Sequence, residues 1–426
     1  MAKRKRRRFD WRDLVIGVLW LLLWTTNRRR SKATFDLEDR GKDVESMVPT
    51  FIGITEGALD KGNRVEVLQN GAYFDRLLDD IAHAKSSIHI ETFVWWNGEI
   101  CDRLAGALAQ RARDGIEVRF LLDYSGSSRA KRRHEMIQLL REAGCEAHLF
   151  HPLRISNIGR MNNRTHRKIG VIDGRIAYIG GHGIAEEWTG NAEDGKHWRD
   201  TFVRMEGPVA TTLQGVFCEN WIEETGRVPT GPKYFPDLHP VGDVDAHVAF
   251  ASPRDSISTV QLLYYLAISA ARKELLIQNP YFLPHSDAIE ELEAAVKRGV
   301  DVRIMLPSAD VIDSPIVQHA SHHHFGDLLK NGVRIFEYRH TLLHQKVMIV
   351  DGTWSCVGST NFDDRSFLLN DEVSVGFTNP GIARQLRDAW LDDLRYCTEI
   401  DFEEWRTRPW THKLLDGLGF LLRREL

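Results

Sequence analysis

From about residue 45 to residue 400, short runs of apolar and β-branched residues alternate with stretches in which apolar residues recur every three or four positions. The first pattern is typical of strands and the second of amphipathic helices, so the chain predicts an α/β protein. The pattern also repeats: residues 86–95 resemble 273–282, and residues 113–122 resemble 297–306. We therefore expect two pseudo-symmetric α/β halves packed face to face, with a cleft between them.

The chain divides at changes of composition. A stretch rich in proline and glycine separates the two similar halves and is typical of a linker. We expect, in order, a basic N-terminal segment with a short apolar anchor, a first half, a linker, a second half and an amphipathic tail, at residues 1–44 (anchor 14–26), 45–225, 226–244, 245–400 and 401–426.

Residues 14–26 form an apolar run between two arginine-rich flanks. A helix of this length reaches about 20 Å, short of the ~30 Å hydrocarbon core of a bilayer. Basic residues rather than small ones follow the run, which argues against a signal-peptidase site. We expect an uncleaved, shallow or half-inserted anchor; a cleaved signal peptide and a buried core helix are the alternatives.

Charge and cysteine content narrow the function classes. The formal net charge of the 426 residues is −4, but ten Lys and Arg against two Asp lie within residues 1–30, so the rest of the chain carries −12. An acidic body is a poor match for nucleic acid, whereas the basic end suits an anionic membrane surface. The five cysteines form no CxxC pair, which indicates free thiols in a reducing compartment and no finger-type zinc site.

The strongest internal repeat aligns HRKIGVIDGRIAYIGG (166–181) with HQKVMIVDGTWSCVGS (344–359). The identical positions are His, Lys, Asp and two Gly. Residues two apart in a strand share a face, so each half presents an imidazole beside an ammonium. The catalytic candidates are His166, Lys168, Asp173, His344, Lys346 and Asp351.

Asp173 and Asp351 differ from the other candidates because each precedes a glycine between two apolar runs. Asp-Gly in this position predicts a tight hairpin turn. Asp is favoured there for backbone reasons, so we interpret a structural role for these two residues as the stronger reading.

Two imidazoles and two ammonium groups suit phosphodiester chemistry. One imidazole can attack phosphorus, the other can protonate the leaving oxygen, and the lysines can hold the phosphate charge. A carboxylate should orient each imidazole through Nδ1. We expect Asp200 to serve His166 and Glu372 to serve His344, since each opens a strand 34 or 28 residues beyond its histidine; solvated strand-end carboxylates are the alternative.

The doubled motif resembles the phospholipase D superfamily, and its context (ETFVW, WRDTFVRMEGP, GSTNFDDRSFLLNDE) is similar to the compact type of bacterial cardiolipin synthase. The resemblance covers residues 60–400 and implies two phospholipase D-type α/β sandwich halves with the active site at their interface. It also implies that Ser359 and Asn361 help to bind phosphate. The first motif departs from the pattern, with Gly181 and Gly183 at the corresponding positions. His182 is a candidate replacement donor, or an ordinary loop histidine.

The resemblance further implies a phosphatidyl transferase that needs no metal or cofactor and forms cardiolipin from phosphatidylglycerol and a second phospholipid. A covalent phosphohistidine would form on His166, with His344 as the acid. A phospholipase D-type hydrolase of lipid or nucleic acid and a non-catalytic membrane scaffold are the alternatives. The expected partners are phospholipids and the bacterial inner membrane, with the body on its cytoplasmic face and no nucleic acid. The sequence does not indicate the headgroups or the oligomeric state.

Three further features have less specific interpretations. The histidines at 319 and 322–324 do not share one face and predict no metal site. The aromatic runs at 93–96 and 281–283 either line an acyl-chain path or pack in the core. The C-terminal stretch 410–422 places its leucines on one helical face, which either lies in a membrane interface or docks on the body.

Overall fold

The computed structural model describes residues 35–421 except 36, 39, 153–161 and 254–256. The expected anchor at 14–26 lies outside the described residues. Among the helices that the structure does describe, none is long and apolar enough to cross a bilayer.

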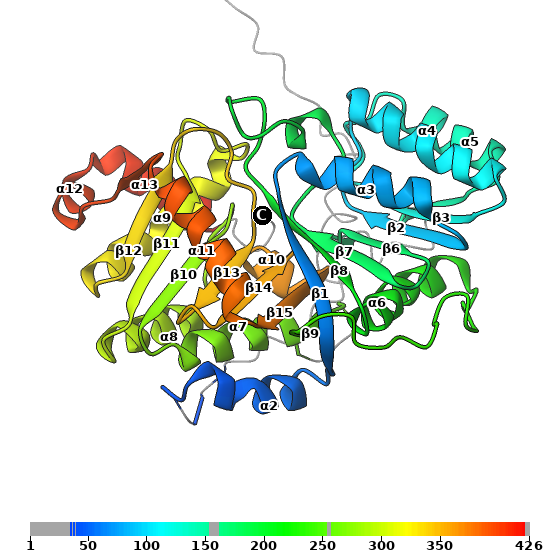
Figure 1. The fold of residues 1–426 in the computed structure, drawn as a ribbon. Coiled ribbons are helices and arrows are strands. Elements are labelled where there is room, and N and C mark those ends of the chain that lie inside the picture. Colours follow the sequence, from blue (N-terminus) through cyan, green and yellow to red (C-terminus); the bar gives the residue numbers. More distant parts are fainter. Residues whose placement is uncertain (1–34, 36, 39, 153–161, 254–256, 422–426) are drawn as a thin grey trace, which may run out of the picture.

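The strands of both halves form one continuous sheet (Figure 1). In the first half the order from the edge inward is β4-β3-β2-β6-β7-β8-β1, and in the second half it is β12-β11-β10-β13-β14-β15-β9, with β16 beyond β12. The two orders match strand for strand, and the antiparallel pair of β1 and β9 joins them. The first-half strands are β1 (Leu59–Gln69), β2 (Ser87–Thr92), β3 (Glu117–Asp123), β4 (Glu146–Phe150), β5 (Arg164–Thr165), β6 (Ile169–Ile172), β7 (Ile176–Gly180) and β8 (Thr201–Glu206). The second-half strands are β9 (Val244–Ala251), β10 (Glu274–Gln278), β11 (Asp301–Pro307), β12 (Arg334–Tyr338), β13 (Val347–Val350), β14 (Trp354–Gly358), β15 (Asn370–Thr378) and β16 (Cys397–Glu399). The predicted duplicated α/β architecture is confirmed, but the halves join edge to edge through β1 and β9, so the expectation that they pack face to face is wrong.

Helices cover both faces of the sheet in each half, which explains why most of the strands are almost wholly buried, whereas β1 and the edge strand β16 are more exposed. One core lies under α3, α4 and α5, a second under α7, α8 and α9, and a third under α6 and α11 across both halves. The helices are α2 (Val44–Ile54), α3 (Ala72–His83), α4 (Glu99–Arg113), α5 (Arg133–Glu142), α6 (Val209–Thr225), α7 (Thr259–Ala270), α8 (Ser286–Lys297), α9 (Pro315–Lys330), α10 (Asp364–Leu368), α11 (Pro380–Leu394), α12 (Phe402–Thr407) and α13 (Trp410–Leu421), with a short 3₁₀ turn at Glu186–Trp188.

The N-terminal helix α2 departs from the expected domain division. Sequence analysis assigned residues from 45 onward to the first half, but Val44, Met47 and Phe51 pack in the core of the second half. Phe51 meets the ring of Trp354 on β14 at a centroid distance of 5.8 Å. A helix that precedes the first half in the chain therefore packs on the second half, and this contact holds the two halves together in addition to the shared sheet.

Both predicted hairpins are present, as β6–β7 and β13–β14. Their turns hold Asp173 and Gly174 at φ +55° and +61°, and Asp351 and Gly352 at φ +52° and +68°. Two consecutive residues of positive φ define the turn that suits the right-handed twist of a hairpin, and Asp-Gly is a preferred sequence for it.

Candidate active site

Each candidate histidine is held by main-chain pairing with the opposite half. β5, which precedes His166, pairs in parallel with the start of β15, and the amide of His166 donates to the carbonyl of Asp371 at 3.0 Å. In the symmetric position, the amide of His344 donates to the carbonyl of Arg199 at 2.7 Å. The chain thus brings both histidines to the junction between the halves.

The same pairing sets which carboxylate reaches which imidazole. Nδ1 of His166 lies 2.9 Å from Oε1 of Glu372, and Nδ1 of His344 lies 2.8 Å from Oδ2 of Asp200. The partners expected from the sequence are therefore wrong: the two carboxylates do contact the histidines, but each serves the histidine of the other half. The physical reason is that each carboxylate begins the strand that receives the other half's histidine segment.

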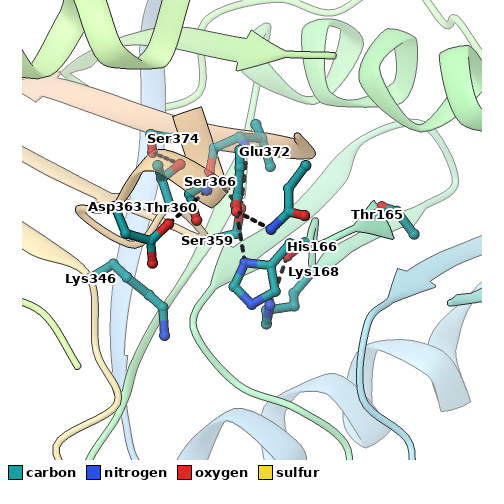
Figure 2. Close-up of polar contacts among 12 residues, drawn as sticks. Thr165, His166, Lys168, Lys346, Ser359, Thr360, Asp363, Ser366, Glu372 and Ser374 are labelled. Carbon is teal, nitrogen blue, oxygen red and sulfur yellow. Dashed lines mark hydrogen bonds and ion pairs between the residues drawn. The ribbon is translucent and has the colours of Figure 1, made fainter. Parts of the chain in front are cut away.

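The two lysines complete the arrangement. Lys168 donates to the carbonyl of His166 at 2.7 Å, and Nζ of Lys346 lies 3.1 and 3.2 Å from the ring nitrogens of His344. Figure 2 shows Lys346 of the second half and Lys168 of the first extending toward the same region beside His166. Each histidine exposes only 8% of its surface, and both lysines are buried.

Burial lowers the pKa of all four basic groups, and the charge of a neighbouring lysine adds to the shift of His166, His344 and Lys168. Desolvation is the largest cause in each case. It lowers the pKa of His166 to about 4 and that of His344 to about 3, although Glu372 and Asp200 oppose the shift and the lysines add to it. The pKa of Lys168 falls to about 7 through burial and the charge of Lys346, and that of Lys346 falls to about 8 through burial. At neutral pH both imidazoles are neutral.

The carboxylates remain ionised in the buried site. Burial raises the pKa of Asp200 and Glu372, but the neighbouring histidines and lysines and the hydrogen bonds that each carboxylate accepts outweigh burial and hold both pKa values below the usual range. An ionised acceptor on Nδ1 fixes the proton of the neutral imidazole there and leaves Nε2 unprotonated. The site therefore offers two oriented nucleophiles or bases beside two cations.

Ser359 supports Glu372 in the second half. Its hydroxyl donates to Oε2 of Glu372 at 2.5 Å (Figure 2). Asn361 is buried, and its Oδ1 has no hydrogen-bond partner among the described residues. The direct phosphate contacts that the resemblance implies for these two residues stay a prediction.

In the first half a tryptophan takes the place of these polar side chains. Nε1 of Trp188 donates to Oδ2 of Asp200 at 2.9 Å, which is the counterpart of the bond from Ser359 to Glu372. A Cβ on Gly181 would lie 2.3 Å from Oδ1 of Asp200, and a Cβ on Gly183 would lie 2.8 Å from the indole of Trp188. The two glycines therefore make room for the carboxylate and for the indole. Sequence analysis missed Trp188, for which the only signal was that the first motif lacks a donor.

His182, the candidate replacement donor, lies on another side of Asp200. Its Nε2 is 2.9 Å from the carbonyl of Asn70, and its ring packs against Tyr73 and Phe202. Its Nδ1 is 4.0 Å from Oδ1 of Asp200. These contacts make it a packed neighbour of the carboxylate.

Asp173 and Asp351 are placed away from the histidines, at the far ends of the hairpins. Asp173 accepts from the backbone amides of Lys85, Ser86 and Ser87 at 2.7–3.1 Å, and Asp351 accepts in the same way from residues 272–274. The four residues of β6 separate Asp173 from Lys168, and the five steps along the chain span about 16 Å at about 3.3 Å per residue. Their inclusion among the catalytic residues is corrected to the structural role.

The two aromatic runs divide between site and core. Phe93 lies edge-on to His166 at a centroid distance of 5.0 Å and within 5.6 Å of Nζ of Lys168. Val94, Trp95 and Phe282 are core residues. Phe93 of the first run is therefore positioned beside the two basic groups of the first half.

The histidine cluster lies on α9, where His319 and His322 face Asp416 of α13. Their ligand atoms and those of Asp416 lie within 4.8 Å of one another. The guanidinium of Arg408 also donates to Asp416, at 2.7 Å, so this carboxylate already has a cationic partner.

Comparison with known proteins identifies the same two segments. The family described as cardiolipin synthase, phospholipase D-like domain, matches residues 77–216 and 264–393. Cardiolipin synthase 2 of Staphylococcus epidermidis is 34% identical over 352 residues, which cover 82% of this chain and 71% of the relative. The major cardiolipin synthase ClsA of Bacillus subtilis is 32% identical over 425 residues, covering 98% and 87% of the two chains.

Solved structures show the same fold at low sequence identity. Phosphatidylserine synthase of Haemophilus influenzae superposes with a TM-score of 0.64 at 12% identity, covering 88% of this chain and 98% of that one. Polyphosphate kinase of Porphyromonas gingivalis superposes with a TM-score of 0.54 at 14% identity, covering 84% and 53%.

Proposed function

This chain belongs to the cardiolipin synthase family of phospholipase D-like proteins, and on that premise we propose that it transfers a phosphatidyl group from one phospholipid to the hydroxyl of another, forming cardiolipin. The observation that carries the proposal is the pair of neutral, carboxylate-oriented imidazoles with two buried lysines at the junction of the halves. The names of the relatives support cardiolipin as the product, and the geometry of the site supports attack by a histidine on a phosphodiester.

The reaction proceeds in two displacements. Nε2 of His166 attacks the phosphorus of phosphatidylglycerol, the bond to the glycerol headgroup oxygen breaks, and His344 in its protonated form gives that oxygen a proton. A hydroxyl of a second phospholipid then loses its proton to His344 and attacks the phosphohistidine, which frees His166 and releases cardiolipin. Atoms and charge balance without a metal or redox partner.

Charge governs the protonation of His344. In the resting site the lysines and burial hold its pKa low, so it is neutral. A phosphodiester anion between the two ammonium groups offsets their repulsion and raises the pKa of the imidazole, which favours the acid form when a leaving group is bound. Lys168 and Lys346 also stabilise the charge that grows on the non-bridging oxygens.

We also propose that the enzyme works at the bacterial inner membrane with its body on the cytoplasmic face. Its substrates reside in the bilayer, and the basic apolar segment at residues 1–30 suits an anionic surface. All five cysteines are free thiols and four of them are buried, which agrees with a reducing compartment.

The test is turnover of labelled phosphatidylglycerol by the purified full chain, with products read by mass spectrometry. Cardiolipin and free glycerol are the expected products, and His166→Ala and His344→Ala should abolish both. His239→Ala is the matched control, because that side chain is 80% exposed in the linker. Phosphatidic acid without cardiolipin would identify a hydrolase, and no lipid change would favour a scaffold.

A further inference from the structure

The C-terminal helix α13 is docked on the body through the side that carries Asp416, Gly419 and Phe420. It packs against α9, and Asp416 and Gly419 are its buried residues. Asp416 accepts from Arg408 and contacts His319, while the backbone of Gly419 lies against the first turns of α9, where a Cβ would come within 2.9 Å. The absence of a side chain at position 419 allows this close approach.

The opposite side of α13 is apolar and exposed. Five large apolar side chains on this side expose between 47% and 73% of their surface: Trp410, Leu414, Leu415, Leu418 and Leu421. Ile316 on the adjoining turn of α9 is 42% exposed and extends the same surface. An amphipathic helix on a soluble body normally turns its leucines inward, so the reversed orientation leaves an apolar surface for another occupant.

We propose that this leucine face of α13 lies in the headgroup region of an anionic bilayer and presents the second half of the enzyme to it. The inference rests on the proposed function, which brings the enzyme to a membrane that contains its substrate. It identifies a second contact, distinct from the N-terminal apolar segment, on the described body.

Charge favours a bilayer over a second copy of the chain. Residues 410–426 contain three Lys or Arg and two Asp or Glu, in a chain whose net charge is −4. One of the two acids, Asp416, is buried and paired with Arg408. Basic residues beside a leucine stripe, with a tryptophan at one end, suit an interface rich in anionic phospholipid.

The position of α13 relative to the active site supports the same assignment. The last turns of α13 meet the start of α9, and the loop before α9 carries Asp313. Asp313 accepts from the hydroxyl of Tyr281 at 2.6 Å, and its charge acts on Lys346 of the active site. The last turns of α13 therefore adjoin the helix whose preceding loop acts on the active-site lysine.

The test places a polarity-sensitive nitrobenzoxadiazole probe on Leu418→Cys in the full chain, reconstituted with phosphatidylcholine–phosphatidylglycerol vesicles. We expect a blue-shifted emission that shallow spin-labelled lipids quench. The matched control is Leu139→Cys on α5, a leucine with 43% exposure outside this surface, whose probe should remain unquenched. The unmutated chain, treated in the same way, gives the background from native cysteines.

The outcomes separate the surface from the activity. A probe at 418 that remains unquenched in vesicles where cardiolipin forms would overturn the surface and leave the function intact. Quenching in vesicles where no cardiolipin forms would support the surface and count against the function. A blue shift without vesicles that grows with protein concentration would assign the face to a second copy and overturn the proposal.

Discussion

Each active-site carboxylate contacts the histidine of the other half, and this pairing predicts which variants share a kinetic defect. Glu372→Gln and Asp200→Asn each replace a charged acceptor by a neutral amide of the same shape, at 2.9 and 2.8 Å from the imidazoles. If Glu372 orients His166, Glu372→Gln should show a milder form of the defect of His166→Ala. If Asp200 orients His344, Asp200→Asn should show a milder form of the defect of His344→Ala.

The expected size follows from the charge that develops on the imidazole. Two unit charges 2.9 Å apart attract by about 6 kcal/mol at an effective dielectric constant of about 20, which is an upper bound. Replacing a hydrogen bond to a charged group by a neutral one costs about 2 kcal/mol, which is the lower bound. At about 1.4 kcal/mol per tenfold, these bounds correspond to rates about 30-fold to about 10⁴-fold slower.

A phosphatidyl ester of p-nitrophenol distinguishes the two pairs, since its leaving group departs without a proton donor. The burst of p-nitrophenolate should be slowed within these bounds in Glu372→Gln and lost in His166→Ala. Asp200→Asn and His344→Ala should retain a burst within about tenfold of normal, although both fail with phosphatidylglycerol. Asp237→Asn, a 91% exposed carboxylate in the linker, is the control. An Asp200→Asn burst that is lost together with that of His166→Ala would refute the crossed pairing; a reversal of both pairs would only exchange the roles of the histidines.

Three further predictions concern the lysines, the tryptophan and the hairpin turn. Because the pKa of Lys168 is about 7, its cationic form is lost as pH rises, and kcat/KM should fall at alkaline pH with an apparent pKa near 7. Lys168→Arg should move this fall to higher pH, because arginine keeps its charge. A kcat/KM that stays constant from about pH 6 to 9 would contradict a role for the lysine cation. Trp188→Phe removes the hydrogen bond to Asp200 and should slow turnover about three- to tenfold, which corresponds to about 1 kcal/mol. The control is Trp221→Phe, which should leave the rate unchanged because Nε1 of Trp221 has no hydrogen-bond partner among the described residues. Equal losses of rate in the two variants would contradict a role for the Trp188 donor. Asp173→Asn should lower the free energy of unfolding by about 1–2 kcal/mol in denaturant titrations while the burst rate stays within a few-fold, and a loss of chemistry at unchanged stability would restore a catalytic role.

Local patterns were enough to predict the duplicated α/β fold and both Asp-Gly hairpins. Strand alternation and turn chemistry are properties of neighbouring residues, so a single chain displays them directly. The His-x-Lys spacing also predicted an imidazole beside a lysine, and Nζ of Lys346 does lie 3.1 Å from the ring of His344. Residues 166–168 and 344–346 precede β6 and β13, however, and do not themselves lie in a strand.

Two of the errors, the carboxylate partners and the place of α2, concern contacts between the halves, and the third concerns a contact within the first half. Spacing along the chain suggested that Asp200 would serve His166, but β5 pairs with β15 and brings Glu372 there instead. Trp188 could not be assigned because the space that it fills depends on glycines whose neighbours come from the folded structure. The position of α2 on the second half could not be predicted either, because the apolar face of a helix does not by itself specify which core it packs against.

The most direct test of the central claim is to trap the phosphatidyl group on the enzyme. The full chain is mixed with labelled phosphatidylglycerol, quenched within one turnover and digested, and the modified peptide is mapped. We predict an acid-labile, base-stable adduct on His166 that is absent from His166→Ala and that forms in His344→Ala when the p-nitrophenyl ester is the donor. Cardiolipin formation at the full rate with no adduct on either histidine would contradict the two-step mechanism.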